Sequence, residues 1–284
     1  MTEADFIAAL RTLPLHSGAE GLLDDAAILE VGGESLILTH DVIAEGVHYR
    51  AGTDPADIAW KLVAVNLSDL AAKGAEPIGV LIGATLDAGS ARFVEGLGEV
   101  LDTYGVKLLG GDTIATGAPA TFGCTAIGRA TSVPVPRRSG ARPGDALYVT
   151  GVIGAAMLGF HGTLEGAYLR PKPRLAEGRA LAPLVHAMMD ISDGLFLDAR
   201  RMAVASGCTA AITLGDVPFA PRILAEGYLA AASWGDDYEL LFAAPADLAL
   251  PVEAKRIGTM LPAGPEPLLI DGNSPPERLG YEHS

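Results

Sequence analysis

Residues 55–85 read PADIAWKLVAVNLSDLAAKGAEPIGVLIGAT and combine a long helical pattern with a strand pattern. The first part predicts a helix over Pro55–Ala72, with Asp54 as the N-cap and Pro55 at the first helical position. The apolar run after the Gly- and Pro-containing segment predicts a strand over Gly79–Thr85. A long helix followed closely by a strand favours a fold that mixes both elements.

The rest of the chain repeats this mixture of elements. We predict further helices at 91–104, 174–184, 195–205 and 221–230, and an acidic amphipathic helix in the first thirteen residues. Strand-like runs occur at 26–29, 36–39, 122–130, 146–150, 210–213 and 239–243. The fold class is therefore α/β (α+β).

A proline- and glycine-rich segment, TSVPVPRRSGARPGD at 131–145, interrupts the pattern of helices and strands. Since 284 residues exceed the usual size of one domain, we expect two domains with a boundary inside this segment. The predicted domains are residues 1–136 and 137–284.

Composition excludes several classes of protein. A net charge of −15 opposes nonspecific binding to nucleic acid, and no apolar run approaches the roughly 20 residues that a membrane span needs. The start of the chain lacks the pattern of a secretory signal, and the two cysteines, Cys124 and Cys208, do not suggest a disulfide framework. We expect a cytoplasmic enzyme without nucleic-acid or membrane partners.

Aspartates at Gly- or Ser-containing turns are the most informative feature. Any one of them could serve only a turn or a helix cap, because Asp side chains bond to nearby backbone amides. As a group they suggest an oxygen-ligand site for magnesium, which typically links carboxylates to substrate phosphates. The set comprises Asp24, Asp25, Asp41, Asp69, Asp112, Asp190, Asp193, Asp236 and Asp237.

Other familiar motifs are missing from the sequence. It has no GxxxxGK[ST] loop, no complete GxGxxG pattern and no GxSxG nucleophile motif. The eight-residue spacing of His40 and His48 matches no usual pair of transition-metal ligands. Phosphate contacts could come from the Gly110-Gly111 pair, although a tight turn explains it equally well, or from Arg137 and Arg138 beside a Gly turn.

Several motifs in order along the chain resemble those of the thiamine-monophosphate kinases, within the aminoimidazole-ribonucleotide-synthetase-like superfamily. NLSDLAAKGAEP, followed by GGDT and then DISDGL, is the most specific combination. The other matching segments are DDAA (24–27), THDVIAEGVHY (39–49), RRSGARPGDALYVTG (137–151), LRPKPR (169–174) and DDYELLF (236–242).

The resemblance implies a fold and a partner. It implies an N-terminal domain in which a mixed sheet with helices forms a homodimer interface, and a C-terminal α/β sandwich. It also implies that ATP as co-substrate and several Mg²⁺ ions are held by aspartates from both halves.

The resemblance assigns roles to single residues. Metal ligands would be Asp25, Thr39, His40, Asp41, Asp69, Asp112, Asp190 and Asp193. ATP would lie against Tyr104, Gly111, Asp112, Arg138 and Ser192, and the thiamine phosphate against His48, Asp236 and Tyr281. No side chain need act as a chemical catalyst, because the phosphate acceptor is already ionised and requires no general base. We therefore expect direct in-line transfer of the γ-phosphate.

Two alternatives remain open at this point. A related kinase of the same fold could phosphorylate an α-ribazole-type nucleoside, with His40 or His48 as a base. A protein that binds nucleotide without catalysis is the other alternative. His40, Trp234 and Asp236 depart from the family pattern, which has Thr, Gly and Glu there, and these departures motivate it.

Overall fold

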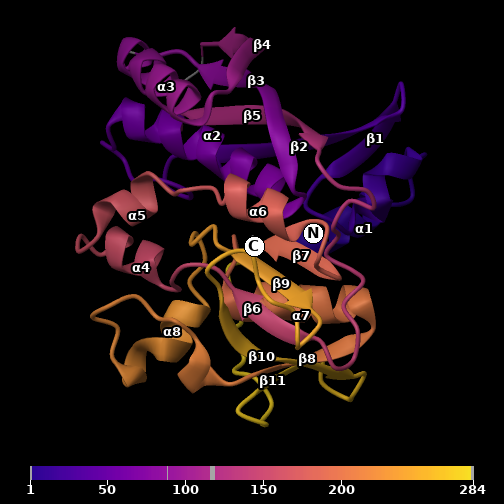
Figure 1. The fold of residues 1–284 in the computed structure, drawn as a ribbon. Coiled ribbons are helices and arrows are strands. Elements are labelled where there is room, and N and C mark those ends of the chain that lie inside the picture. Colours follow the sequence, from indigo (N-terminus) through magenta and orange to yellow (C-terminus); the bar gives the residue numbers. More distant parts are fainter. Residues whose placement is uncertain (1, 88, 116–118, 283–284) are drawn as a thin grey trace.

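The computed structural model describes residues 2–87, 89–115 and 119–282. Two β-sheets form its two halves, the first built from the N-terminal half of the chain and the second from the C-terminal half (Figure 1). Helices and strands alternate along the chain in both halves, which confirms the predicted α/β (α+β) fold class.

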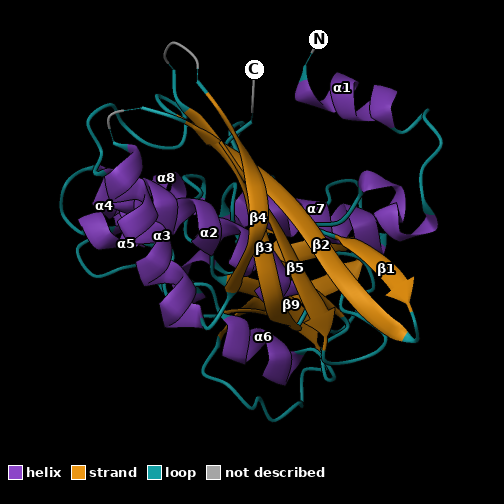
Figure 2. Cartoon of the chain, turned by 90° about the horizontal axis from the view of Figure 1, so that it is seen from above, coloured by secondary structure: helices purple, strands orange, loops and turns teal. Residues whose placement is uncertain are grey.

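The first sheet is mixed, with the strand order β1-β2-β5-β3-β4. β3 and β4 pair in parallel, and the other neighbours pair antiparallel. Helices α2 (Pro55–Ala72) and α3 (Ser90–Tyr104) lie on one face of this sheet, and the view from above looks onto its other face (Figure 2). The strands are β1 (Ala27–Val31), β2 (Glu34–Ala44), β3 (Ala75–Thr85), β4 (Lys107–Ile114) and β5 (Thr121–Ala130).

Helix α2 is the central element of the molecule. The Asp54 side chain accepts a hydrogen bond from the Ala56 amide and Pro55 occupies the first turn, as predicted. Fifteen of its residues are buried, because the helix packs on β2 and β5 on one side and on α6 (Leu175–Leu181) and β7 (Ala187–Asp190) on the other. Polar residues of α2 are therefore held between the two halves of the molecule.

The second sheet has six strands in the order β11-β8-β10-β6-β9-β7. Its neighbours pair antiparallel except for β11 and β8, which are parallel. Helix α7 (Leu195–Ser206) packs against β7 and β8. The other strands are β6 (Ala146–Val149), β8 (Cys208–Ile212), β9 (Leu240–Ala244), β10 (Lys255–Pro262) and β11 (Leu268–Ile270).

Short helices complete the described chain. The α-helices are α1 (Glu3–Leu10), α4 (Ala155–Phe160), α5 (Glu165–Leu169) and α8 (Tyr228–Ala232), and the 3-10 helices are η1 (Ser17–Leu22), η2 (Leu214–Asp216) and η3 (Ala225–Gly227). Among the described helices, none is both long and apolar enough to cross a membrane.

Sequence and structure differ at a few elements. The predicted helix 221–230 is wrong in extent, because Arg222 has a positive φ of 86° and regular helix starts only at Tyr228. The predicted helix 174–184 ends at Leu181, shortly before Pro183. The chain crosses from the first sheet to the second between Ala130 and Ala146, so the boundary placed after residue 136 lies in this linker and stays a prediction.

Candidate active site

A cavity of about 560 Å³ lies between the two halves. Its lining combines carboxylates, polar groups and aromatic rings from both sheets, so the cavity depends on the packing of one half on the other. The acidic side chains in this lining are Asp41, Asp69, Asp190, Asp193 and Asp236. The structure thus brings together aspartates that are up to 195 residues apart in the sequence.

Two of these carboxylates come from the first half, where β2 faces α2. Thr39 is buried on the face of β2 that packs on α2, and Asp41, two residues further on, shares that face. The Asn66 side chain on α2 accepts a hydrogen bond from the Asp41 amide at 3.0 Å. One turn further along α2, the Asp69 carboxylate accepts a hydrogen bond from the Thr39 hydroxyl. Strand and helix therefore fix Asp41 and Asp69 beside each other.

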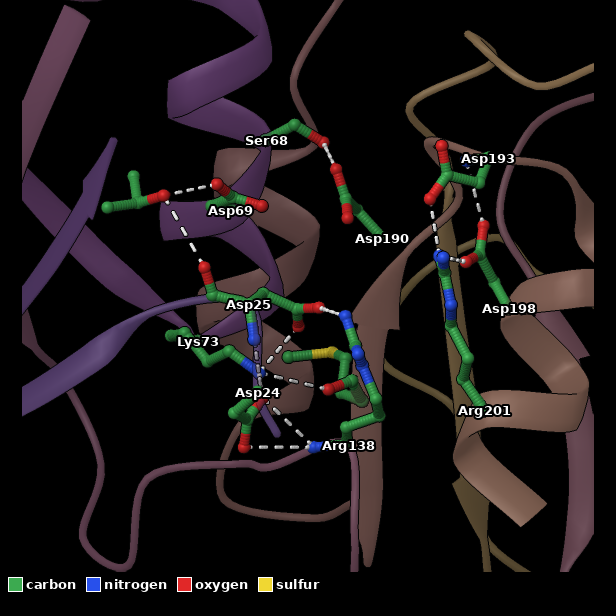
Figure 3. A network of polar contacts seen from close by, with 12 residues as sticks. Asp24, Asp25, Ser68, Asp69, Lys73, Arg138, Asp190, Asp193, Asp198 and Arg201 are labelled. Atoms are coloured by element: carbon green, nitrogen blue, oxygen red, sulfur yellow. Dashed lines mark hydrogen bonds and ion pairs between the residues drawn. The ribbon is translucent and has the colours of Figure 1, made fainter. Parts of the chain in front are cut away.

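The second half supplies Asp190 and Asp193 from the end of β7 and the turn that follows. Ser68 Oγ on α2 donates a hydrogen bond to Asp190 Oδ2 at 2.7 Å, which ties the two halves together. The Asp193 carboxylate forms an ion pair with Arg201 of α7. Buried Asp198 accepts hydrogen bonds from the Asp193 and Gly194 amides and so anchors the turn to the start of α7 (Figure 3).

A further acidic pair, Asp24 and Asp25, lies in the turn before β1. The buried Lys73 ammonium, at the C-terminal end of α2, forms ion pairs with both carboxylates, at 2.7 Å from Asp25 Oδ2 (Figure 3). Arg138 adds a side-chain contact of 2.5 Å to Asp25 Oδ1 and a backbone hydrogen bond to Asp24. This pair is therefore neutralised by cations of the protein itself.

The electrostatic state of the carboxylates differs accordingly. Burial alone would raise the pKa of Asp25, but Lys73 and Arg138 outweigh it and lower the pKa to about 2. Burial and the charges of Asp193 and Asp25 raise the pKa of Asp41 to about 6. Burial, followed by neighbouring aspartates, raises the pKa values of Asp69 and Asp190 well above the usual range. Asp41, Asp69 and Asp190 thus lack sufficient positive charge nearby.

These residues fit magnesium better than a transition metal. The available ligands are carboxylate and hydroxyl oxygens, which hard cations prefer. Among the described residues, no three His, Cys, Asp or Glu side chains stand close enough to hold a metal by themselves. This arrangement suits Mg²⁺, which commonly takes one or two carboxylates and completes its shell with water and substrate phosphate. The residues that fit are Asp41, Asp69, Asp190 and Asp193, with Thr39 beside them.

Two predicted metal ligands do not join this group within one chain. The sheet register shows where Asp112 lies. Val42 of β2 is opposite Gly123 of β5, Gly123 is opposite Gly83 of β3, and Gly83 is opposite Asp112 of β4. Because residues in register point to the same face of a sheet, the Asp112 side chain lies on the same face as Val42. Asp41 lies on the opposite face. The His40 ring also lies on the Asp112 face, where its Nδ1 is 2.8 Å from Thr125 Oγ1, although His40 contributes to the cavity lining.

The predicted nucleotide contacts are also divided. Ser192 lines the cavity, and Arg138 contacts Asp25 beside it. Gly111 and Asp112 line a second cavity of about 470 Å³ under α3. Tyr104, at the end of α3, packs edge-on against Trp60 with ring centroids 5.9 Å apart. One subunit therefore does not place all the predicted ATP contacts in a single pocket.

The predicted substrate contacts His48, Asp236 and Tyr281 all line the first cavity. His48 and Asp236 lie at one end of it, where the Lys61 ammonium group contacts both residues. His48 Nδ1 accepts a hydrogen bond from the Ala44 amide at 3.1 Å, so a neutral His48 ring carries its proton on Nε2. The Phe160 and Trp234 rings, 5.1 Å apart, form an aromatic wall there. This end of the cavity suits a ligand with an aromatic group.

Sequence reasoning missed several residues of the site. Lys61 and Lys73 are fully buried lysines on α2 and at its end, and Asp198 holds the Asp193 turn. Asn66 and Ser68 lie inside the NLSD motif, so their position beside Asp69 was a signal that they share its site. The sequence near Lys61 and Lys73 gives no sign that these lysines are buried, because their acidic partners are distant in the sequence.

Comparison with known proteins identifies the class. Residues 23–130 match the family described as AIR synthase related protein, N-terminal domain, and residues 142–259 match its C-terminal domain. The two halves with a carboxylate-lined cavity between them are thus the two domains of an AIR synthase-related protein.

Full-length relatives narrow the identification. The thiamine-monophosphate kinase of Caulobacter vibrioides is 35% identical over 99% of this chain and 91% of its own length. The structure described as "AaThiL complexed with AMPPCP and TMP" superposes with a TM-score of 0.90 at 27% identity, covering 100% of this chain and 97% of that one. The thiamine-monophosphate kinase of Stenotrophomonas maltophilia gives 0.77 at 32% identity, covering 95% and 96%. The chain belongs to the thiamine-monophosphate kinase family.

Proposed function

We propose that this protein transfers the γ-phosphate of ATP to thiamine monophosphate and so makes thiamine diphosphate. The observation that carries the proposal is the cavity in which Asp41, Asp69, Asp190 and Asp193 face an aromatic end with His48, Asp236 and Tyr281. Asp41, Asp69 and Asp190 lack counter-charges and suit metal-bound phosphates, and the aromatic end suits the thiamine rings. The family relationship agrees with both features.

Magnesium is the metal that we assign to the carboxylates. When bound, it supplies the positive charge that lets two polyanions approach and stabilises charge on the transferred group. Asp41, Asp69 and Asp190 would each contribute ligands to it, with Asp193 near Asp41, whereas Asp25, which was also predicted as a ligand, is already paired with Lys73 and Arg138.

The protein's own residues act by binding and orientation. The acceptor phosphate is already ionised at neutral pH, so no side chain has to remove a proton from it. His48 and Asp236 orient the acceptor, Tyr281 stacks on one of its rings, and Arg138 and Ser192 contact the nucleotide. Transfer is then direct and in line, without a phosphoenzyme.

We also propose a homodimer that pairs the open faces of two first sheets. This face carries exposed Val42, Leu81 and Ile114 together with Asp112, and α2 and α3 cover only the other face. Pairing would bury these side chains and bring the partner subunit's Asp112 toward a cavity that Asp112 cannot reach within its own chain. A cytoplasmic location and the absence of nucleic-acid partners stay predictions from the sequence.

The activity is tested with purified protein, ATP and magnesium. We expect release of ADP and formation of thiamine diphosphate with thiamine monophosphate as acceptor, and no comparable turnover with thiamine or with nucleosides. ADP release with a nucleoside alone would favour the related nucleoside kinase. ATP binding without any ADP release would favour a non-catalytic protein.

The shared site is tested by mixing two variants. Asp69→Asn and Asp112→Asn should each have strongly reduced turnover as homodimers. In a mixed dimer, one site would combine an intact Asp69 from one chain with an intact Asp112 from the other, so activity should return after subunit exchange. No recovery in demonstrated mixed dimers would contradict the shared site.

A further inference from the structure

Lys61 is a buried cation beside His48 and Asp236, two of the residues assigned to the acceptor. It lies on α2, and its side chain is 1% exposed. Its ammonium group lies 2.9 Å from Asp236 Oδ2 and donates a hydrogen bond to the His48 carbonyl oxygen at 3.0 Å. It also lies 3.8 Å from the centroid of the Tyr168 ring, within cation–π range.

These contacts connect both residues that we assign to the acceptor. His48 follows β2 in the first half, whereas Asp236 belongs to the loop before β9 in the second half. Tyr168 supports the same point, because its hydroxyl donates a second hydrogen bond to the His48 carbonyl at 2.8 Å. One ammonium group thus joins the two halves of the molecule where the acceptor is expected to bind.

The loop that carries Asp236 needs such support. Asp236 and Tyr238 adopt positive φ values of 61° and 51°, a region that non-glycine residues seldom occupy without help from their surroundings. The Tyr238 hydroxyl donates to Asp236 Oδ1 at 3.0 Å while Lys61 holds Oδ2, so each carboxylate oxygen has its own partner. The Asp236 side chain remains 24% exposed, which leaves it accessible from the cavity.

The acidic partner of Lys61, Asp236, stands at a position where the family pattern has the longer glutamate. A shorter side chain reaches less far into the cavity, so its orientation matters more for contact with a ligand. Burial lowers the pKa of Lys61, and the Asp236 charge opposes that effect. The Asp236 charge thus offsets part of the cost of burying the Lys61 ammonium group, and Lys61 in turn helps to hold the Asp236 carboxylate in place.

We propose that Lys61 is the positioning residue of the acceptor site, holding the Asp236 carboxylate and the His48 main chain in the arrangement that binds thiamine monophosphate. The proposal rests on the proposed function, since it assumes that acceptor. Lys61 does not touch the reacting phosphates in this account. It acts through Asp236 and His48, and its removal should weaken acceptor binding while nucleotide binding is retained.

A double-mutant cycle tests the proposal. Lys61→Met, Asp236→Asn and the double variant are compared by calorimetry for the dissociation constants of thiamine monophosphate alone and of AMPPCP with magnesium. Lys255→Met, which removes an exposed lysine on β10, is the matched control. If Lys61→Met does not fold, Lys61→Gln replaces it in the cycle, and thermal unfolding verifies each variant.

We expect Lys61→Met to raise the dissociation constant for thiamine monophosphate by about tenfold or more, the scale for lost support of a binding group. The AMPPCP constant should change by less than about threefold, within the usual error of additivity for distant sites. In the Asp236→Asn background, Lys61→Met should add much less, because its effect passes through Asp236.

Three results would overturn the role of Lys61: unchanged acceptor affinity, equal losses for both ligands, or independent and fully additive effects of the two substitutions. Failure of the proposed function is distinguishable. In that case the wild-type protein itself would neither bind thiamine monophosphate nor release ADP with it.

Discussion

Two groups of carboxylates, one beside the cavity and one lining it, differ in how their charge is balanced. Asp24 and Asp25 are paired with Lys73 and Arg138, and the pKa of Asp25 falls to about 2. We call them the paired group. The Asp69 and Asp190 carboxylates accept hydrogen bonds from the Thr39 and Ser68 hydroxyls, and Asp41 lies near both. The pKa values of all three rise because burial and mutual repulsion disfavour ionisation. We call them the open group.

This difference separates a structural role from a binding role. The paired group contributes to stability without any ligand, because its countercharges are built into the fold. Ionisation of the open group lowers the stability of the folded protein unless cations bind to it. The open group is therefore suited to bind cations. A sequence shows the same residue type in both groups, and only the neighbouring side chains distinguish them.

The largest effect is expected from the open group. Asp69→Asn removes one carboxylate charge while keeping the shape of the side chain. We expect turnover to fall by about 100- to 1000-fold, comparable to the loss of one transition-state electrostatic contact. ADP release at saturating ATP and thiamine monophosphate measures it. A rate within about threefold of wild type would show that Asp69 does not hold the metal.

Substitution in the paired group should lower the stability of the folded protein. Lys73→Met leaves Asp24 and Asp25 buried with Arg138 as their remaining cation, so we expect a loss of about 3–5 kcal/mol in the free energy of unfolding without magnesium. Urea unfolding in EDTA measures the loss, and Lys107→Met on the exposed strand β4 is the control.

Magnesium sharpens this test. If a divalent ion can replace the lost ammonium charge, magnesium should stabilise Lys73→Met more than it stabilises the wild-type protein. Equal stability of Lys73→Met and wild type in EDTA would contradict the role of Lys73 as the internal countercharge.

The pH dependence of stability should differ between the groups. For Asp41 the folded pKa of about 6 lies above the usual value, so the folded state holds the proton longer and stability falls as pH rises toward and through 6. Magnesium should offset this loss above pH 6. For Asp25 the folded pKa is lowered, so its contribution is present above about pH 4 and is lost as pH falls toward 2.

Thermal unfolding between pH 5 and 8, with EDTA or with magnesium, measures the first effect. We expect the two curves to separate as the pH rises. Curves that stay parallel over this range would argue against ionisation of the open group being linked to metal binding.

The smallest effect is expected from Thr39, whose hydroxyl donates to Asp69. Thr39→Val keeps the shape of the side chain and removes one hydrogen bond to a charged group. We therefore expect the transition state to be destabilised by at most about 1.5–3 kcal/mol. The ratio kcat/KM for ATP measures it. A loss as large as that of Asp69→Asn would mean that Thr39 has a more direct role than orienting Asp69.

Part of this arrangement could be predicted from the sequence. Local signals were sufficient for α2, because Asp54, Pro55 and the apolar pattern act within a few turns. Taking the aspartates as a group predicted one shared site, and Asp41, Asp69, Asp190 and Asp193 do line one cavity. Asp41 and Asp69, however, lie within β2 and α2 and not at turns. The family motifs added the expected roles of His48, Asp236 and Tyr281.

Other features depend on tertiary pairing. The face on which Asp112 lies follows from the register of β4 against β3, which the Gly-rich segment LLGGDT does not reveal. Lys61 pairs with a residue 175 positions away, and a helical pattern alone gives no reason to bury a lysine. The paired and open groups could not be separated from sequence for the same reason, since Arg138 and Lys73 approach Asp25 only in the folded chain.

The central claim is that the open group, and not the paired group, recruits the divalent cations. Anomalous diffraction from crystals grown with Mn²⁺, AMPPCP and thiamine monophosphate tests it most directly. The account predicts manganese peaks in contact with Asp41, Asp69 and Asp190, with Lys73 still bound to Asp24. Peaks at Asp24 with Lys73 displaced, or no peak at the open group, would contradict it.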